Sequence, residues 1–178
     1  YNMCKGHDFT DCYVSVYSFE KYDVSSWDRS SAIIDTVFMD FDSDDANNVS
    51  AVFKEVKKFA MKLMKDAVTP RVYFSGAKGF HVFLDFAPVK LKDAKCAIRR
   101  VAAFFADAFK LKFMDWQVVG DIARISRIPG TFNAKSGMRC TPIPAKRFVK
   151  MTFDDVLRAA KGELSPIEWE ESDAVRQS

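Results

Sequence analysis

Two aspartates, Asp40 and Asp42, stand near the end of a run of β-branched and aromatic residues, AIIDTVFMDFD over 32–42. In a strand, a spacing of two places both carboxylates on one face. Like charges on a buried strand repel each other, and Mg²⁺ or Mn²⁺, which prefer carboxylate oxygens, would relieve that repulsion. The alternative is a strand that ends in a solvated turn whose acids only cap the next helix. We assign that capping role to Asp44 and Asp45.

A second group of polar residues lies in the segment SGAKGFH over 75–81, between two short apolar runs. It offers a hydroxyl, two glycines whose backbone N–H groups can approach an anion, an ammonium and an imidazole, at Ser75, Gly76, Gly79, Lys78 and His81. Together these are the donors that a triphosphate needs. The alternative is an ordinary hairpin turn with a solvated lysine. The segment is not a Walker A loop, which requires G-x-x-x-x-G-K-[ST] at the start of a helix.

A third acid, Asp121, opens a segment that contains no further acid until Asp154. Seven positive charges lie between them, at Arg124, Arg127, Lys135, Arg139, Lys146, Arg147 and Lys150. Such a local excess suits a polyphosphate or a nucleic-acid backbone. The alternative is a solvated basic surface.

The composition is that of a folded domain. The chain has 178 residues, of which 48% are hydrophobic, and its 27 Lys and Arg against 24 Asp and Glu give a formal charge of +3. These values exclude a disordered or low-complexity chain. No apolar run approaches the roughly 18 residues that span a bilayer, so we expect no membrane partner. Four cysteines are too few for a disulfide scaffold, so we expect a cytoplasmic protein.

The elements that must position these residues are interleaved strands and helices, which predicts an α/β or α+β fold. Strands are expected over 32–42, 71–74, 80–86 and 118–128. Helices are expected from Val49 to Lys65, from about Leu91 to Lys110 and over 153–160. In the second helix Ala94, Ile98, Val101, Phe105 and Phe109 recur at helical spacing and are expected to face inward.

Three motifs follow in a fixed order, VFMDFD (37–42), SGAKGFHVF (75–83) and DIARISRIPGTFNAKSG (121–137). In that order they resemble the catalytic core of the archaeo-eukaryotic primase superfamily, over residues 32–144. The third motif is most similar to the compact archaeal, plasmid, viral and CRISPR-associated primase-polymerases. The resemblance implies an RRM-like sheet packed on a second α/β unit, with the active site in the cleft between them.

The resemblance also implies a function, a metal-dependent, template-directed nucleotidyltransferase. Such a DNA primase or primase-polymerase makes or extends a primer strand from NTP or dNTP on single-stranded DNA. Asp40, Asp42 and Asp121 would hold two Mg²⁺ or Mn²⁺ ions, one activating the 3′-hydroxyl and one binding the triphosphate. The nucleotide would be bound by Ser75, Gly76, Lys78, Gly79, His81, Arg124, Arg127, Asn133 and Lys135. Template contacts would come from Arg139, Lys146, Arg147 and Lys150.

The chain begins at Tyr1 rather than Met, so we expect residues 1–178 to be one catalytic domain of a longer protein. A helicase or an accessory domain or subunit would accompany it there. The residues do not distinguish ribonucleotides from deoxynucleotides, or initiation from extension.

A zinc site near the start is a further alternative. Cys4, His7 and Cys12 have suggestive spacing, and Cys96 or Cys140 would be the fourth ligand. We favour free, reduced cysteines, because three ligands with a distant fourth are thin support for a zinc site.

Two other functions remain open. An end-joining repair polymerase of the same superfamily would use the same acids and a similar loop, with Lys146, Arg147 and Lys150 as candidates for binding a 5′-phosphate. A non-catalytic RRM-type RNA-binding domain is the more distant reading, because Lys78-Gly79-Phe80 begins like an RNP1 motif. Three acids on a base-stacking face would repel RNA, which favours the enzyme.

Overall fold

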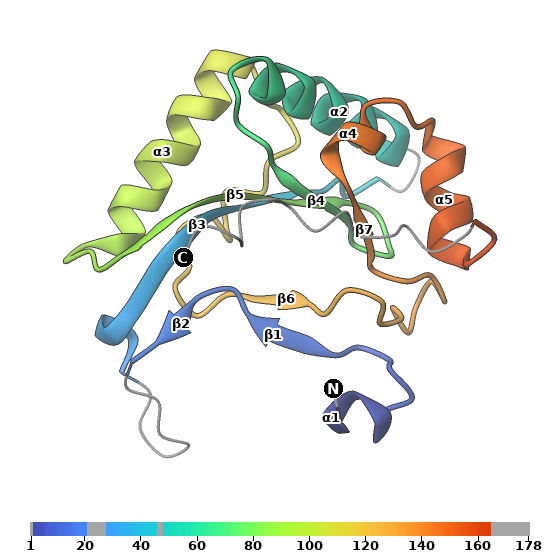
Figure 1. The fold of residues 1–178 in the computed structure, drawn as a ribbon, viewed down its shortest axis with the longest axis horizontal. Helices are drawn as coiled ribbons and strands as arrows, with labels where there is room; N and C mark the ends of the chain where they lie inside the picture. Colours follow the sequence, from blue (N-terminus) through green and yellow to red (C-terminus); the bar gives the residue numbers. More distant parts are fainter. Residues whose placement is uncertain (1, 21–27, 46–47, 165–178) are drawn as a thin grey trace.

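The structure is a computed structural model that describes residues 2–20, 28–45 and 48–164. Its centre is a curled antiparallel sheet (Figure 1). In spatial order its strands are β2 (Ser18–Phe19), β3 (Ala32–Phe41), β5 (Phe80–Val89), β4 (Arg71–Phe74) and β7 (Thr141–Ile143). The helices along its upper side in Figure 1 are α2 (Val49–Lys65), α3 (Ala94–Phe109), α4 (Ala145–Phe148) and α5 (Phe153–Lys161).

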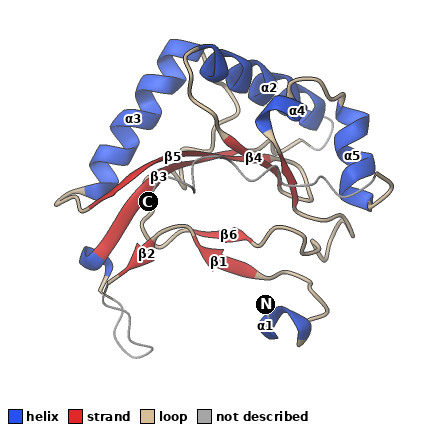
Figure 2. Ribbon diagram, in the orientation of Figure 1, coloured by secondary structure: helices blue, strands red, loops and turns tan. Residues whose placement is uncertain are grey.

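A two-stranded ribbon lies on the other side of the sheet (Figure 2). It pairs β1 (Tyr13–Ser15) with β6 (Ile125–Arg127), and the short helix α1 (Asn2–Lys5) precedes it. A single 3₁₀ turn, η1 (Arg29–Ser31), leads into β3. The sheet therefore has a face covered by helices and a face turned toward the ribbon.

All strand pairs of both sheets are antiparallel. The fold is thus mixed α+β, as one of the two expected classes. The expected strand over 32–42 and the hairpin formed by 71–74 and 80–86 are confirmed, since β4 and β5 pair directly. The five-residue loop between them brings the start of β5 beside the end of β3, which is the pairing that positions the site.

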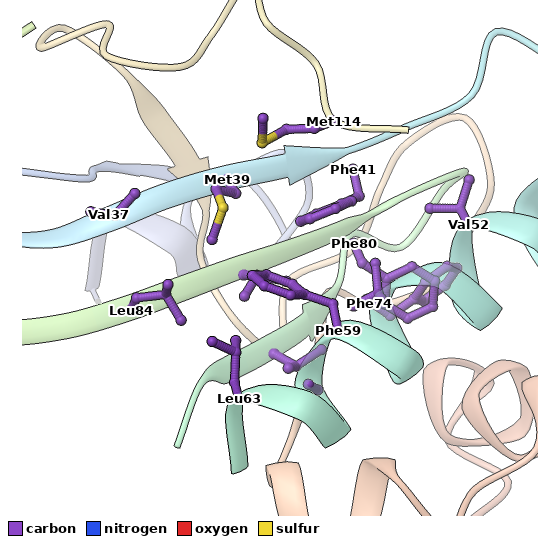
Figure 3. Packing of buried hydrophobic residues seen from close by; sticks show 14 of the residues in the cluster. Val37, Met39, Phe41, Val52, Phe59, Leu63, Phe74, Phe80, Leu84 and Met114 are labelled. Carbon is purple, nitrogen blue, oxygen red and sulfur yellow. The ribbon is translucent and has the colours of Figure 1, made fainter. Parts of the chain in front are cut away.

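The helix-covered face holds the main hydrophobic core (Figure 3). Val37, Met39 and Phe41 point from β3 into it, as the period of two predicts. Helix α2 covers them with residues that recur at helical spacing and with Phe59, which falls on the same face; the spaced residues are Val49, Val52, Phe53, Val56, Ala60 and Leu63. Aromatic rings interlock throughout, for example Phe53 with Phe148 at 5.4 Å between ring centroids.

Several local predictions are wrong. Helix α3 begins at Ala94 rather than Leu91, and it packs through Ile98, Ala102 and Ala106, so Val101 is exposed. The buried stripe of α3 runs along Ile98, Ala102 and Ala106, and Val101, one position before Ala102, lies off that stripe. The expected strand over 118–128 is shortened to β6, because turns occupy most of residues 116–124.

Neither Asp44 nor Asp45, to which the capping role was assigned, is the N-cap of α2. Helix α2 begins at Val49, and its N-cap is Asn48, which makes no side-chain capping bond. Asp44 is exposed and lies 3.9 Å from the Lys78 ammonium, while the backbone carbonyl of Asp45 accepts from the N–H of Asn48. The strand therefore runs into a turn before the helix starts.

No helix within the described ranges is long and apolar enough to cross a membrane.

Candidate active site

Asp40 and His81 are cross-strand neighbours on the face of the sheet that is turned toward the ribbon. They are paired in the β3–β5 register, and His81 Nε2 lies 3.8 Å from Asp40 Oδ1. Phe38 and Phe83 lie on the same face, and their rings pack at 5.0 Å. The expected alternation of both strands is confirmed, because Phe80, Val82 and Leu84 belong to the core on the opposite face.

Arg124 reaches this pair from the turn that precedes β6. Its Nη2 donates to Asp40 Oδ2 at 3.0 Å, and its guanidinium lies 5.9 Å from the centre of the Phe38 ring. The Nε of Arg124 is buried and has no hydrogen-bond partner among the described residues. A buried donor without a partner is costly, so an anionic oxygen that reached it would be stabilised.

The ionisation of the pair is shifted in opposite directions. Burial raises the pKa of Asp40 to about 6 against the opposing charge of Arg124, and the carboxylates of Asp42 and Asp115 add to the rise. Burial, helped by the charges of Arg124 and Arg127, lowers the pKa of His81 to about 4. At neutral pH the site therefore holds a carboxylate beside a neutral imidazole, whose Nδ1 lies 3.2 Å from the hydroxyl of Ser126. Strongly shifted groups in one place are typical of functional sites.

The Ser75–Gly79 loop is fixed against the end of β3. Ser75 N–H donates to the carbonyl of Gly79 at 3.0 Å, and Gly79 N–H donates back to the Ser75 hydroxyl at 3.3 Å. A Cβ on Gly79 would collide with the carbonyl oxygen of Phe41. Gly76 has φ of +81°, and its carbonyl accepts from the hydroxyl of Ser136. Glycine is therefore required at Gly79 for the loop to lie this close to β3, and at Gly76 because of its positive φ and its close approach to the carbonyl of Met138.

Lys78 projects from that loop to the second acid of the pair. Its Nζ lies 3.3 Å from Asp42 Oδ2, and both side chains are partly exposed. The backbone of Asp42 is held by a hydrogen bond from its N–H to the carbonyl of Phe113 at 2.9 Å. The structure thus brings together the first two motifs, with Arg124 from the third.

Asp121 lies in the turn before Arg124, and its side chain is exposed. Its Oδ1 accepts from the N–H of Ala123 at 3.0 Å. Burial raises the pKa of Tyr17 to about 12, and the charge of Asp121 adds to that rise. Within the described ranges no three His, Cys, Asp or Glu side chains gather closely enough to hold a metal ion. A three-carboxylate metal site stays a prediction.

The other predicted nucleotide-binding residues lie around the ribbon. The buried guanidinium of Arg127 pairs with Asp11 and also donates to the Tyr13 hydroxyl at 2.7 Å, so it ties β6 to β1. The side-chain oxygen of Asn133 accepts from the N–H of Lys135 at 2.9 Å, which closes a local turn. The Lys135 side chain is exposed.

The residues predicted to contact a template do not form one group. The guanidinium of Arg139 stacks on the Phe132 ring at 4.6 Å. Lys146 and Arg147 belong to α4, which packs through Phe148 on the helix-covered face, and exposed Lys150 follows it. These three basic residues are therefore carried by the layer opposite Asp40 and His81.

Two residues of the site, Asp115 and Ser126, were not predicted from the sequence. Asp115 lies beside the end of β3, because its N–H donates to the carbonyl of Asp40 at 2.8 Å. Its segment meets β3 through an isolated bridge, Met114 opposite Phe41, and so carries no strand pattern that could have marked it. Ser126 lies between the two arginines of the third motif, and its hydroxyl contacts the His81 ring. The feature of the sequence that could have identified Ser126 is its position between Arg124 and Arg127.

All four cysteines are free thiols. Cys4 is buried, and the Cys12 Sγ donates to the carbonyl of Thr10 at 3.5 Å. Burial, together with the neighbouring Cys4 thiol, raises the pKa of Cys12. Cys96 is exposed on α3 and Cys140 is buried beside Tyr73, far apart in the fold.

No protein-family model and no curated protein matches this sequence. Among solved structures, the fold is similar to the polymerase domain of Mycobacterium tuberculosis Ligase D in complex with DNA, with a TM-score of 0.53. The two chains are 17% identical, and the match covers 83% of this chain and 58% of the neighbour. The chain thus spans less than two thirds of that structure, and the similarity establishes a likeness of fold.

Proposed function

We propose that this protein is a metal-dependent, template-directed nucleotidyltransferase that makes or extends a primer on DNA. The observation that carries the proposal is the meeting of Asp40, His81 and Arg124, which come from three separate motifs, on one face of the sheet. We assign the fold to the archaeo-eukaryotic primase superfamily, with the β1–β6 ribbon as part of the second unit. The fold likeness to a polymerase domain bound to DNA supports this assignment.

The donor set fits divalent cations. Asp40 is nearly buried, and the acids Asp42 and Asp115 both oppose its ionisation. A divalent cation would remove that repulsion, and carboxylate oxygens are the ligands that Mg²⁺ and Mn²⁺ prefer. Asp40 and Asp42 would hold the cations, joined by Asp121. Bound there, the cations would supply charge neutralisation and activation of the attacking hydroxyl.

The neighbouring residues would bind the triphosphate. The Lys78 Nζ lies 3.3 Å from Asp42 Oδ2, and its ammonium would contact phosphate oxygens beside the carboxylates. Arg124 contributes its partnerless Nε, and His81, neutral at physiological pH, contributes a hydrogen bond without a charge. The Ser75–Gly79 loop holds Lys78 and His81 at these positions.

The proposed reaction is the transfer of a nucleotidyl group to the primer. The 3′-oxygen of the primer forms a bond to the α-phosphorus, and the bond from that phosphorus to the bridging oxygen of the β-phosphate breaks. The primer hydroxyl loses its proton, and pyrophosphate leaves. The residues around Asp40 act mainly by positioning and by stabilising charge, as phosphoryl transfer requires.

A repair polymerase that only extends existing ends is the second candidate. It is favoured by the fold likeness to the polymerase domain of Ligase D. Both candidates use the same acids and the same loop, so they differ in whether the protein needs a primer.

The test offers the protein single-stranded DNA, with or without an annealed primer, labelled nucleotides, and Mg²⁺, Mn²⁺ or EDTA. We expect metal-dependent incorporation that is abolished by EDTA. Product without primer would identify a primase, and product only with primer would identify an extending polymerase. Incorporation in EDTA, or none with either metal on either substrate, would overturn the proposal.

A further inference from the structure

An open groove of about 550 Å³ lies between the first turns of α3 and the segment that follows Asp115. Lys95, Cys96, Arg99 and Arg100 line it from the helix, and Trp116 lines it from the opposite side. Its volume falls within the range of about 300–1,000 Å³ that is typical of ligand sites. None of these residues was predicted to bind a nucleic acid or a nucleotide.

The charge of the groove is positive. Three basic side chains stand against one acid, Asp93, and that carboxylate caps α3 by accepting from the N–H of Cys96 at 3.0 Å. Lys95 and Arg100 are exposed. Within the described residues, no ion pair is formed by either side chain, so both charges are available to an anion.

Trp116 adds a flat apolar surface to this positive charge. Its side chain is 40% exposed although tryptophan is usually well buried. Arg99 holds the backbone beneath it, because its Nη1 donates to the carbonyls of Trp116 and Val119 at 3.2 and 3.1 Å. The guanidinium also lies 6.0 Å from the indole centre, so the ring is supported from one side.

The groove adjoins the candidate active site. Trp116 directly follows Asp115, whose N–H donates to the carbonyl of Asp40. One wall of the groove therefore continues into the segment that borders the end of β3, while its other wall, α3, belongs to the helix-covered layer.

We propose that this groove binds single-stranded nucleic acid, with a base stacked on Trp116 and backbone phosphates on Lys95 and Arg100. A basic track beside an exposed aromatic ring is the arrangement that binds single strands without sequence preference. An inorganic polyanion would interact with the basic side chains alone, whereas a nucleic acid also has bases that stack on the Trp116 ring. The binding does not depend on the proposed polymerase activity.

The first test measures binding of a fluorescent twelve-residue oligodeoxythymidylate by anisotropy, in EDTA and without nucleotides. Trp116→Ala should weaken binding by about 5- to 150-fold, since one stacked base contributes roughly 1–3 kcal/mol. Trp116→Phe should keep most of the affinity. Thermal unfolding of each variant checks that it is folded. A folded Trp116→Ala protein that binds as tightly as the wild type would overturn the proposal.

The salt dependence tests the two basic residues. The double variant Lys95→Gln, Arg100→Gln should lower the slope of log affinity against log salt by about 1.4, because each phosphate contact on a single strand contributes about 0.7. The matched control is Lys65→Gln, Lys161→Gln, which removes two exposed charges outside the groove. Equal slopes for the two double variants would contradict the assignment.

Alkylation of Cys96, whose side chain is exposed and lines the groove, reports directly on occupancy. The oligonucleotide should protect Cys96, while inorganic polyphosphate of matched charge should protect Cys96 much less. Unprotected Cys96 at saturating oligonucleotide, or equal protection by polyphosphate, would overturn the proposal. Because no metal or triphosphate is present, these results are separate from success or failure of the incorporation assay.

Discussion

The two faces of the central sheet are built from the same strands, but one packs the hydrophobic core and the other carries the candidate active site. On the helix-covered face, Met39, Phe41 and Phe80 are fully buried among other apolar side chains. On the ribbon-facing side, the adjacent positions Asp40 and His81 are polar, their side chains keep 14% and 10% of their exposure, and both pKa values are shifted. The alternation of side chains along each strand thus places core residues on one face and the candidate active-site residues on the other.

This difference shows where burial stabilises the fold and where it opposes stability. Burial of aromatic side chains stabilises the helix-covered face in proportion to the area removed from water. Burial of Asp40 raises its pKa, so keeping it ionised at neutral pH costs stability. Natural proteins accept such a cost mainly at functional sites.

The largest expected effect compares Phe80 with Phe83, three residues apart on β5 but on opposite faces. Phe80 is fully buried against Phe74 and Phe148, so Phe80→Ala should lower the free energy of unfolding by about 3–5 kcal/mol. Phe83 is 8% exposed and lies at the smaller cluster, so Phe83→Ala should cost clearly less. Denaturant unfolding of both variants measures the difference, and equal losses would contradict the division between faces.

The next effect concerns Arg124, which opposes the rise in the pKa of Asp40. Arg124→Gln removes that charge, so the pKa of Asp40 should rise further, by about one to three units. The acid limb of the pH profile of nucleotide incorporation should move to higher pH by a similar amount. Arg139→Gln, which removes a guanidinium stacked on Phe132, is the matched control and should leave the limb in place. An unmoved limb in Arg124→Gln would break the link between Arg124 and Asp40.

The smallest effect is the pH dependence of Mn²⁺ binding by the unaltered protein. With a pKa of about 6, Asp40 is ionised at pH 7.5 and largely protonated at pH 5. Since a cation must displace that proton, affinity should fall about tenfold between pH 7.5 and 5. The pKa of Asp40 is raised by folding. Between about pH 4 and pH 6 the folded apo protein therefore keeps a proton on Asp40 that the unfolded chain has released. His81, with a pKa near 4, stays neutral over this window. Calorimetric titration at both pH values measures the change, and pH-independent affinity would contradict it.

Much of the fold was predictable because it depends on local periodicity. The strand 32–42, the β4–β5 hairpin and the inward face of α2 all follow from apolar spacing. The errors arise where tertiary packing overrides that spacing. Val101 has helical spacing with the core residues but is exposed, because α3 packs through alanines instead. The turns before β6 replace a predicted strand, because that segment crosses from one side of the sheet to the other.

The candidate site was predictable in its parts but not in its contacts. Asp40, Ser75 and His81 were selected by residue type and by motif order. The approach of Arg124 to Asp40 joins residues 84 positions apart, and only the fold shows it. Arg127 illustrates the converse, because an arginine in a basic motif is used to fasten β6 to β1 through Asp11 and Tyr13.

The central claim is that Asp40 is essential to nucleotide incorporation and not to folding. The most direct measurement is primer extension by Asp40→Asn beside Asp107→Asn, which removes an exposed carboxylate from α3. We predict a loss of about a thousandfold in Asp40→Asn, equivalent to about 4 kcal/mol in the barrier, with folding retained, and near wild-type rates for Asp107→Asn. Full activity in Asp40→Asn, or equal losses in both variants, would contradict the account.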